Sequence, residues 1–95
     1  MCTYRTELLA VHGSGKGPAG WFTLSDVSVY VDHPVHALAL HTLNIDLRNP
    51  ELGPAARVAV ELDATSARAL AEAIVRALDD LPPGVMDQSP ASQGT

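Results

Sequence analysis

Three of the four histidines of the chain lie close together, with an aspartate beside the first of them. Asp32 and His33 precede Pro34, His36 follows it, and His41 comes a few residues later. Imidazole nitrogens bind zinc, copper, iron and nickel, and three of them leave one coordination position open. Pro34 interrupts strand pairing, so His33 and His36 fall in a turn from which both side chains can reach one ion. The sequence therefore predicts a divalent transition-metal site at His33, His36 and His41, with Asp32 as a further ligand or as the acceptor that fixes an imidazole tautomer.

Each histidine also has a purely structural interpretation. The spacing matches no zinc-finger or zincin pattern, and His41 reaches the turn only if the chain folds back or a neighbouring subunit supplies it. In the structural interpretation His33 is a solvated turn residue, His36 begins a strand, and His41 is a core histidine bonded to the backbone.

Acid/base catalysis without a metal is an alternative use of the same region. His41 with Asp32 or Asp46 would supply a general base and its partner. However, successive side chains of a strand point to opposite faces, so His41 and Asp46 do not align on a regular strand.

Thr42, Asn44 and Asp46 do align, because they are spaced two residues apart. Tyr30 is expected on the neighbouring strand. Such a polar row either faces solvent or lines a pocket. Tyr30, Thr42, Asn44 and Asp46 are therefore the candidate ligand-pocket residues.

Three other features invite a functional interpretation. The glycine-rich stretch Gly13–Gly17 contains Lys16, but no helix follows it as a phosphate-binding P-loop requires, so a flexible hairpin loop is expected. Trp21 and Phe22 are expected to plug a thin core beneath that loop. Cys2, the only cysteine, excludes an intramolecular disulfide and is interpreted as a small apolar residue near the terminus.

Composition limits the class of protein. The chain has 95 residues, of which 46% are hydrophobic and 18% charged, which is typical of one globular domain. Its net charge is −5, and its arginines and lysine form no basic stripe, so no nucleic-acid partner is expected. The absence of an apolar run of about 18 residues predicts that the chain does not enter a membrane. A cytoplasmic protein is expected.

Periodicity predicts four strands and one helix. Alternating or β-branched segments predict strands over Thr3–Val11, Asp26–Asp32, Ala37–Arg48 and Arg57–Leu62, with turns at His33–His36 and Asn49–Pro54. Asp63 is a good N-cap for a helix that Pro82, Pro83 and Gly84 end. The apolar side chains of this helix recur at helical spacing: Ala67, Leu70, Ala71, Ile74, Leu78 and Leu81.

The predicted fold is therefore α+β with the order β-β-β-β-α. A four-stranded, mostly antiparallel sheet carries the C-terminal helix packed on one face. Residues 1–83 form this domain, and residues 84–95 are expected to be a disordered tail. The second sheet face is too apolar for solvent, which favours self-association as a homodimer or a small ring, or else a monomer with a ligand cavity.

Three segments carry a family resemblance: Met1–Tyr4, the stretch Ser14–Pro18 ahead of Trp21, and Asp32–His36 through Asp46. With these, the chain resembles small uncharacterised proteins of actinobacteria over roughly residues 1–80. The resemblance implies no activity.

The favoured hypothesis from the residues is a self-associating domain that binds a divalent metal or a small ligand through the histidine cluster. The alternatives are a small acid/base enzyme and a structural or interaction subunit without chemistry of its own.

Overall fold

The computed structural model describes residues 5–32 and 41–85 of the chain. The chain divides into two compact units, residues 1–64 and 65–95, and each is described by itself. The first unit is a single sheet, and the second contains the helix.

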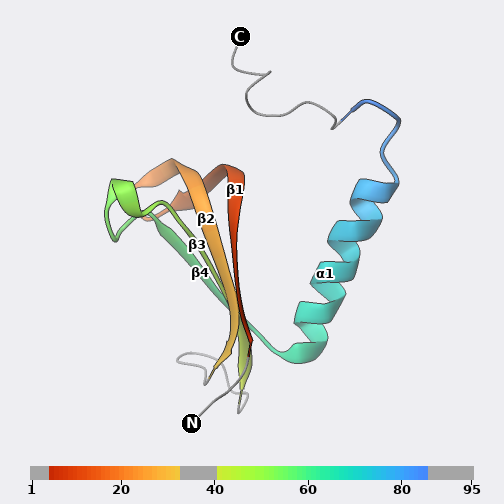
Figure 1. Cartoon of the computed structure of the whole chain (residues 1–95), viewed down its shortest axis with the longest axis horizontal. Coiled ribbons are helices and arrows are strands. Elements are labelled where there is room, and N and C mark those ends of the chain that lie inside the picture. The colour runs from red at the N-terminus through yellow and green to blue at the C-terminus, as the bar shows by residue number, and fades with distance from the viewer. Residues whose placement is uncertain (1–4, 33–40, 86–95) are drawn as a thin grey trace. The chain divides into compact units, whose positions relative to one another are not determined.

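The sheet has four antiparallel strands in the order β1-β2-β3-β4 (Figure 1). Its elements are β1 (Thr6–Gly17), β2 (Gly20–Asp32), β3 (Thr42–Arg48), the 3-10 turn η1 (Pro50–Leu52) and β4 (Arg57–Leu62), followed by the helix α1 (Ala64–Asp79). The predicted β-β-β-β-α order and the antiparallel sheet are confirmed. No helix among the described residues is long and apolar enough to cross a membrane.

The glycine-rich stretch is strand rather than loop, so that prediction was wrong. β1 continues through Gly17 and β2 begins at Gly20, and these two glycines pair across a two-residue turn. Gly20 has a φ of 114°, a conformation that glycine adopts without steric cost. The register of β1 against β2 shifts between Ala10 and Gly13, which marks a bulge.

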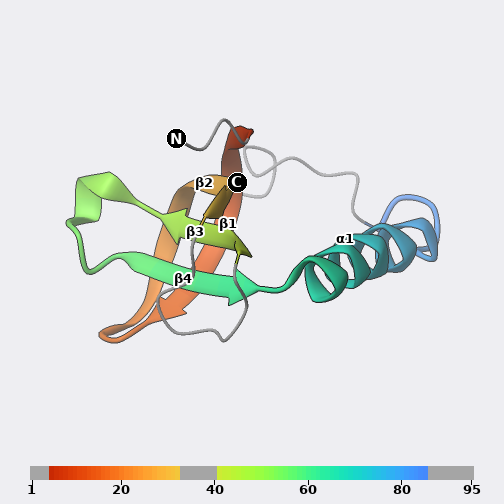
Figure 2. The ribbon, with the colours of Figure 1, turned by 90° about the horizontal axis from the view of Figure 1, so that it is seen from below.

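The sheet is strongly twisted, as the crossing of the β1–β2 hairpin over β3 and β4 shows (Figure 2). The twist brings the end of β1 toward β4. A Cβ atom added at Gly15 would lie 3.2 Å from Leu24 Cδ2 and 3.5 Å from Val58 Cγ2. The absence of a side chain at Gly15 allows this approach.

Strand boundaries agree with prediction best near the C-terminal end of the sheet. β4 has the predicted bounds, and β3 ends at the predicted Arg48. β3 begins at Thr42 instead of Ala37, and residues 37–40 and the predicted turn at 33–36 lie outside the described residues.

Asn49 organises the β3–β4 turn. Its side-chain Oδ1 accepts a hydrogen bond from the Glu51 backbone N–H at 3.2 Å, and its Nδ2 donates to the Thr23 carbonyl at 2.9 Å.

The apolar face of the sheet is less buried than is usual for an antiparallel sheet. The apolar face, with Val29, Leu43, Ile45, Leu47, Val58, Val60 and Leu62, is only half-buried. Among the described hydrophobic residues, only Leu24 and Val27 are buried. Trp21 is 71% exposed, so its predicted role as a core plug was wrong, whereas Phe22 is half-buried.

The helix forms where the sequence predicted it, directly after Asp63 and ending before Pro82. Within the described chain no residue of α1 is buried. The predicted packing of this helix on one sheet face, and with it the single domain over residues 1–83, remains a prediction. Of the expected tail over 84–95, residues 86–95 lie outside the described residues.

Gly20 provides a test of the hairpin. We expect Gly20→Ala to lower the free energy of unfolding by about 1–2 kcal/mol, because alanine at a positive φ is strained. Gly13→Ala is the matched control, since no positive φ constrains Gly13 and no atom lies within 4 Å of an added Cβ. Denaturant unfolding measures both variants, and equal stabilities would contradict the turn conformation.

Candidate functional site

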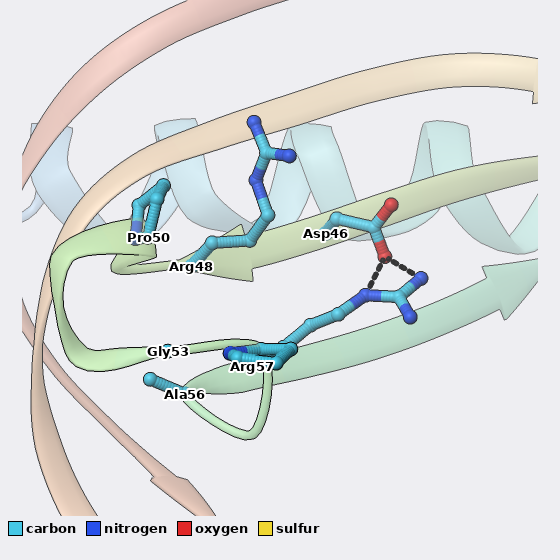
Figure 3. A pocket seen from close by; sticks show the side chains of 7 residues that line it. Asp46, Arg48, Pro50, Gly53, Ala56 and Arg57 are labelled. Atoms are coloured by element: carbon cyan, nitrogen blue, oxygen red, sulfur yellow. Dashed lines mark hydrogen bonds and ion pairs between the residues drawn. The ribbon is translucent and has the colours of Figure 1, made fainter.

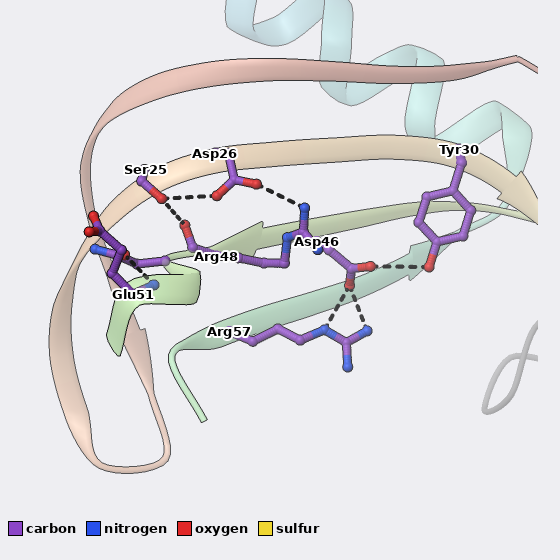
Figure 4. A network of polar contacts seen from close by, with 8 residues as sticks. Ser25, Asp26, Tyr30, Asp46, Arg48, Glu51 and Arg57 are labelled. Carbon is purple, nitrogen blue, oxygen red and sulfur yellow. Dashed lines mark hydrogen bonds and ion pairs between the residues drawn. The ribbon is translucent and has the colours of Figure 1, made fainter. Parts of the chain in front are cut away.

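A buried carboxylate stands at the centre of the polar sheet face. Asp46, on β3, is 8% exposed. Its Oδ2 accepts a hydrogen bond from the Tyr30 hydroxyl on β2 at 3.1 Å, and its Oδ1 accepts two from Arg57 on β4, from Nε at 3.1 Å and from Nη2 at 2.8 Å (Figure 4). Asp46 therefore links three neighbouring strands through one side chain.

A second ion pair, between Arg48 and Asp26, lies on the same face of the sheet. Arg48 Nη2 donates to Asp26 Oδ2 at 2.8 Å, and the Ser25 hydroxyl donates to Asp26 Oδ1 at 2.9 Å (Figure 4). Arg48 and Arg57 are direct cross-strand partners in the β3–β4 ladder. Like charges at opposed positions repel, so each arginine depends on its own carboxylate.

The polar row predicted from the sequence is buried rather than solvated. Thr42 is 1% exposed, and its hydroxyl donates to Asn44 Oδ1 at 2.7 Å. Asn44 pairs with Tyr30 in the β2–β3 ladder. The structure therefore brings the four candidate pocket residues, Tyr30, Thr42, Asn44 and Asp46, together on one face.

A hollow opens beside this network at the β3–β4 turn. It has a volume of about 440 Å³ and is lined by Asp46, Arg48, Pro50, Gly53, Pro54, Ala56 and Arg57. Pro50, Gly53 and Ala56 lie toward the turn, and Asp46 lies at the other end (Figure 3). Of the four candidate pocket residues, Asp46 alone lines this hollow. Its size is in the range of small-molecule sites.

The residues that line the hollow include two arginines and one aspartate, whose charges sum to +1. Asp26, which pairs with Arg48 from outside the lining, balances that charge. The Arg57 side chain is 51% exposed, and among the described residues its hydrogen bonds use Nε and Nη2 only. The buried Arg48 Nε has no hydrogen-bond partner there. The Nη1 group of the half-exposed Arg57 side chain thus remains available beside the turn, whereas the Arg48 Nε is closed to solvent.

Two of the four predicted metal ligands, His33 and His36, lie outside the described residues, as does Cys2. Asp32 ends β2 and His41 directly precedes β3, and both take part in polar interactions. Within residues 5–32 and 41–85 no group of three potential ligands converges. The His33, His36, His41 and Asp32 site remains a prediction.

Sequence reasoning missed both arginines of the hollow. Arg48 and Arg57 flank the segment predicted as a turn, and antiparallel pairing across that turn places them opposite each other. The signal was therefore present as two basic residues at the two ends of a hairpin connection. Asp26 was likewise recognised only as the start of a strand.

These observations define a small α+β domain whose sheet holds a buried polar network beside an arginine-lined hollow. The chain belongs to the family of unknown function DUF6295, whose model matches residues 1–87. The predicted resemblance to an uncharacterised family is thereby confirmed. Comparison with curated proteins and with solved structures gives no match.

The pKa of the Tyr30 hydroxyl is raised in the folded protein. Burial, then the hydrogen bond to Asp46 and the charge of that carboxylate, raise the pKa of Tyr30 above its ordinary value. The folded protein therefore keeps this proton to higher pH than the unfolded chain does. Stability must fall as the pH rises between the two pKa values, because the folded state then binds more protons.

We expect the free energy of unfolding to decline above about pH 10 more steeply in the native protein than in Tyr30→Phe. Phenolate absorbance measures the same group directly, since the difference between native and Tyr30→Phe titrations isolates Tyr30 from Tyr4. A Tyr30 transition at or below about pH 10 would show that the phenol is not held by Asp46.

Proposed function

We propose that this protein binds a small organic anion, with a carboxylate or phosphate group held by Arg48 and Arg57. The observation that supports it is the cross-strand arginine pair, because both residues line one hollow. Guanidinium groups recognise planar carboxylates and phosphates through paired N–H donors.

The ion pairs of the sheet favour this function because they orient the arginines. Arg57 is bound through two nitrogens to Asp46, which fixes the plane of its guanidinium group. Arg48 is held by Asp26, which does not line the hollow. Both cations are therefore positioned before a ligand arrives, which reduces the entropic cost of binding.

The remaining walls favour a ligand with a short apolar part. Pro50, Pro54 and Ala56 offer apolar surface, and Gly53 leaves room for close approach to the backbone. Gly53 has a φ of 98°, so a side chain there would strain the turn. The predicted ligand is therefore a small acid rather than a bare inorganic ion.

The alternative of an acid/base enzyme using Asp46 receives less support. Both carboxylate oxygens of Asp46 already accept hydrogen bonds, one from Tyr30 and two from Arg57, so the carboxylate is engaged within the sheet. A metal-binding role for the histidines, a bacterial or actinobacterial source and a cytoplasmic location stay predictions, the last based on the single cysteine.

The binding test uses inorganic phosphate, butyrate and a short alkyl phosphate as probes, followed by amide chemical shifts. We expect shifts concentrated around the β3–β4 turn and tighter binding of the alkyl phosphate than of phosphate. Arg57→Gln should weaken binding about tenfold or more, because a hydrogen bond to a charged group contributes roughly 1.5–3 kcal/mol.

Arg5→Gln is the matched control. Arg5 lies in the same unit but is largely exposed and pairs with Glu7, so this variant should bind as the native protein does. Shifts that ignore Arg57→Gln, or shifts located away from the turn in the native protein, would contradict the proposed site.

A further inference from the structure

The half of the β1–β2 hairpin nearest its turn carries glycines and large apolar side chains on one face. Gly13 pairs with Leu24 and Gly15 with Phe22, so these four residues share that face. A Cβ atom added at Gly15 would lie 3.2 Å from Leu24 Cδ2, and one added at Gly17 would lie 3.1 Å from Phe22 Cε1. The large side chains of this face therefore lie directly against the glycine backbone.

The opposite face of the same half of the hairpin is open to solvent. Lys16 pairs with Trp21 in the ladder, and Ser14 pairs with Thr23. All four residues are exposed, and Trp21 is 71% exposed. They form a two-by-two block, here called the Trp21 platform: Ser14, Lys16, Trp21 and Thr23.

The side chains of the Trp21 platform are not engaged with the rest of residues 5–32 and 41–85. No hydrogen bond, ion pair or ring contact within that part of the chain involves them. Thr23 accepts a hydrogen bond from Asn49, but through its backbone carbonyl. One indole ring, one ammonium group and two hydroxyls are therefore available to a ligand.

The geometry of the ladder sets the size of that ligand. Neighbouring strands lie about 4.8 Å apart, and residues two apart on one strand lie about 6.8 Å apart. The Trp21 platform therefore accommodates a single six-membered ring on the indole, with substituents of the ring at Lys16 across the ladder and at Thr23 along the strand. The packed glycine face behind it holds this arrangement before a ligand binds, which lowers the entropic cost of binding.

The chemistry of the Trp21 platform favours a sugar ring. The negative π-face of an indole attracts polarised C–H groups, which one side of a pyranose ring presents. Ser14 and Thr23 can each donate and accept a hydrogen bond, as sugar hydroxyls do. A nucleic-acid strand would also stack on the indole, but its row of phosphates needs several cations, and the chain has a net charge of −5.

Lys16 specifies the charge of the sugar. It is the only charged residue between Gly13 and Leu24. Its ammonium group is exposed beside the indole, so one carboxylate on the stacked ring would complement it.

We propose that the Trp21 platform binds an acidic sugar, with the pyranose ring stacked on Trp21 and its carboxylate paired with Lys16. This inference is independent of the proposed anion site, because no residue of the Trp21 platform lines the hollow at Arg48 and Arg57.

The test compares methyl glucuronide with methyl glucoside, which carries a hydroxymethyl group in place of the carboxylate. Trp21 is the only tryptophan of the chain, so its fluorescence reports contact with the ring directly. We expect the glucuronide to saturate with a Kd on the order of 1 mM. The glucoside should bind about two- to fivefold more weakly, because an exposed ion pair contributes modestly. Lys16→Gln should remove the difference between the two sugars.

Amide chemical shifts extend the test to a variant without tryptophan. Trp21→Ala should lose saturable binding of both sugars. Leu8→Ala is the matched control, since Leu8 is a 71% exposed residue of the same hairpin outside the Trp21 platform. Arg57→Gln should bind the glucuronide at the Trp21 platform as the native protein does, which separates a failure here from a failure of the proposed anion site.

Four outcomes would overturn the proposal. One is a glucuronide that leaves the Trp21 fluorescence unchanged at ten times the expected Kd, and another is equal affinity of the native protein for the two sugars. The third is tighter binding of adenosine monophosphate at the Trp21 platform, which would assign it to nucleotides. The fourth is Trp21 fluorescence that changes with protein concentration alone, which would assign this surface to the predicted homodimer.

Discussion

The carboxylate of Asp46 is the constraint on which the rest of the sheet depends. A buried charge is stable only when hydrogen bonds replace the water it has lost. Asp46 obtains them from Tyr30 and Arg57, one on each neighbouring strand. A slip of one residue in either ladder would move these groups to opposite faces and leave the charge unpaired. The register of β2, β3 and β4 is therefore set by polar chemistry as much as by apolar alternation.

This arrangement reverses the usual roles of the two faces. The polar face holds the buried residues Ser28, Thr42, Asn44 and Asp46, while most described residues of the apolar face, Val27 excepted, are only half-buried. Within residues 5–32 and 41–85 only two apolar side chains, Leu24 and Val27, are buried, and they contribute little to the stability of this part of the chain. The sheet therefore relies on specific hydrogen bonds for its order. The same polar network orients Arg48 and Arg57 at the hollow, so one set of interactions serves the fold and the candidate site.

The sequence predicted those elements whose signal is local. The alternation of Arg57–Leu62 and the amphipathic spacing after Asp63 led to β4 and α1 directly. The stretch Gly13–Gly20 was misjudged because glycine weakens strand propensity, whereas hairpin pairing and the close approach at Gly15 decide its conformation. Alignment of Thr42, Asn44 and Asp46 was visible, but whether water or protein covers them depends on the twist of the whole sheet. The arginine pair needed the register across the turn, which composition does not reveal.

The most direct measurement of the central claim is a double-mutant cycle between Asp46 and Arg57, using Asp46→Asn and Arg57→Gln in denaturant unfolding. The partly exposed pair Asp26–Arg48 serves as the reference cycle. Residues in one buried network couple by roughly 0.5–3 kcal/mol, and exposed ion pairs by about 0–1 kcal/mol. We predict a coupling free energy above 1 kcal/mol for Asp46–Arg57 and a smaller one for the reference. A coupling free energy near zero for Asp46–Arg57 would contradict the account, because the ion pair of the buried carboxylate would then contribute nothing to the stability of the sheet.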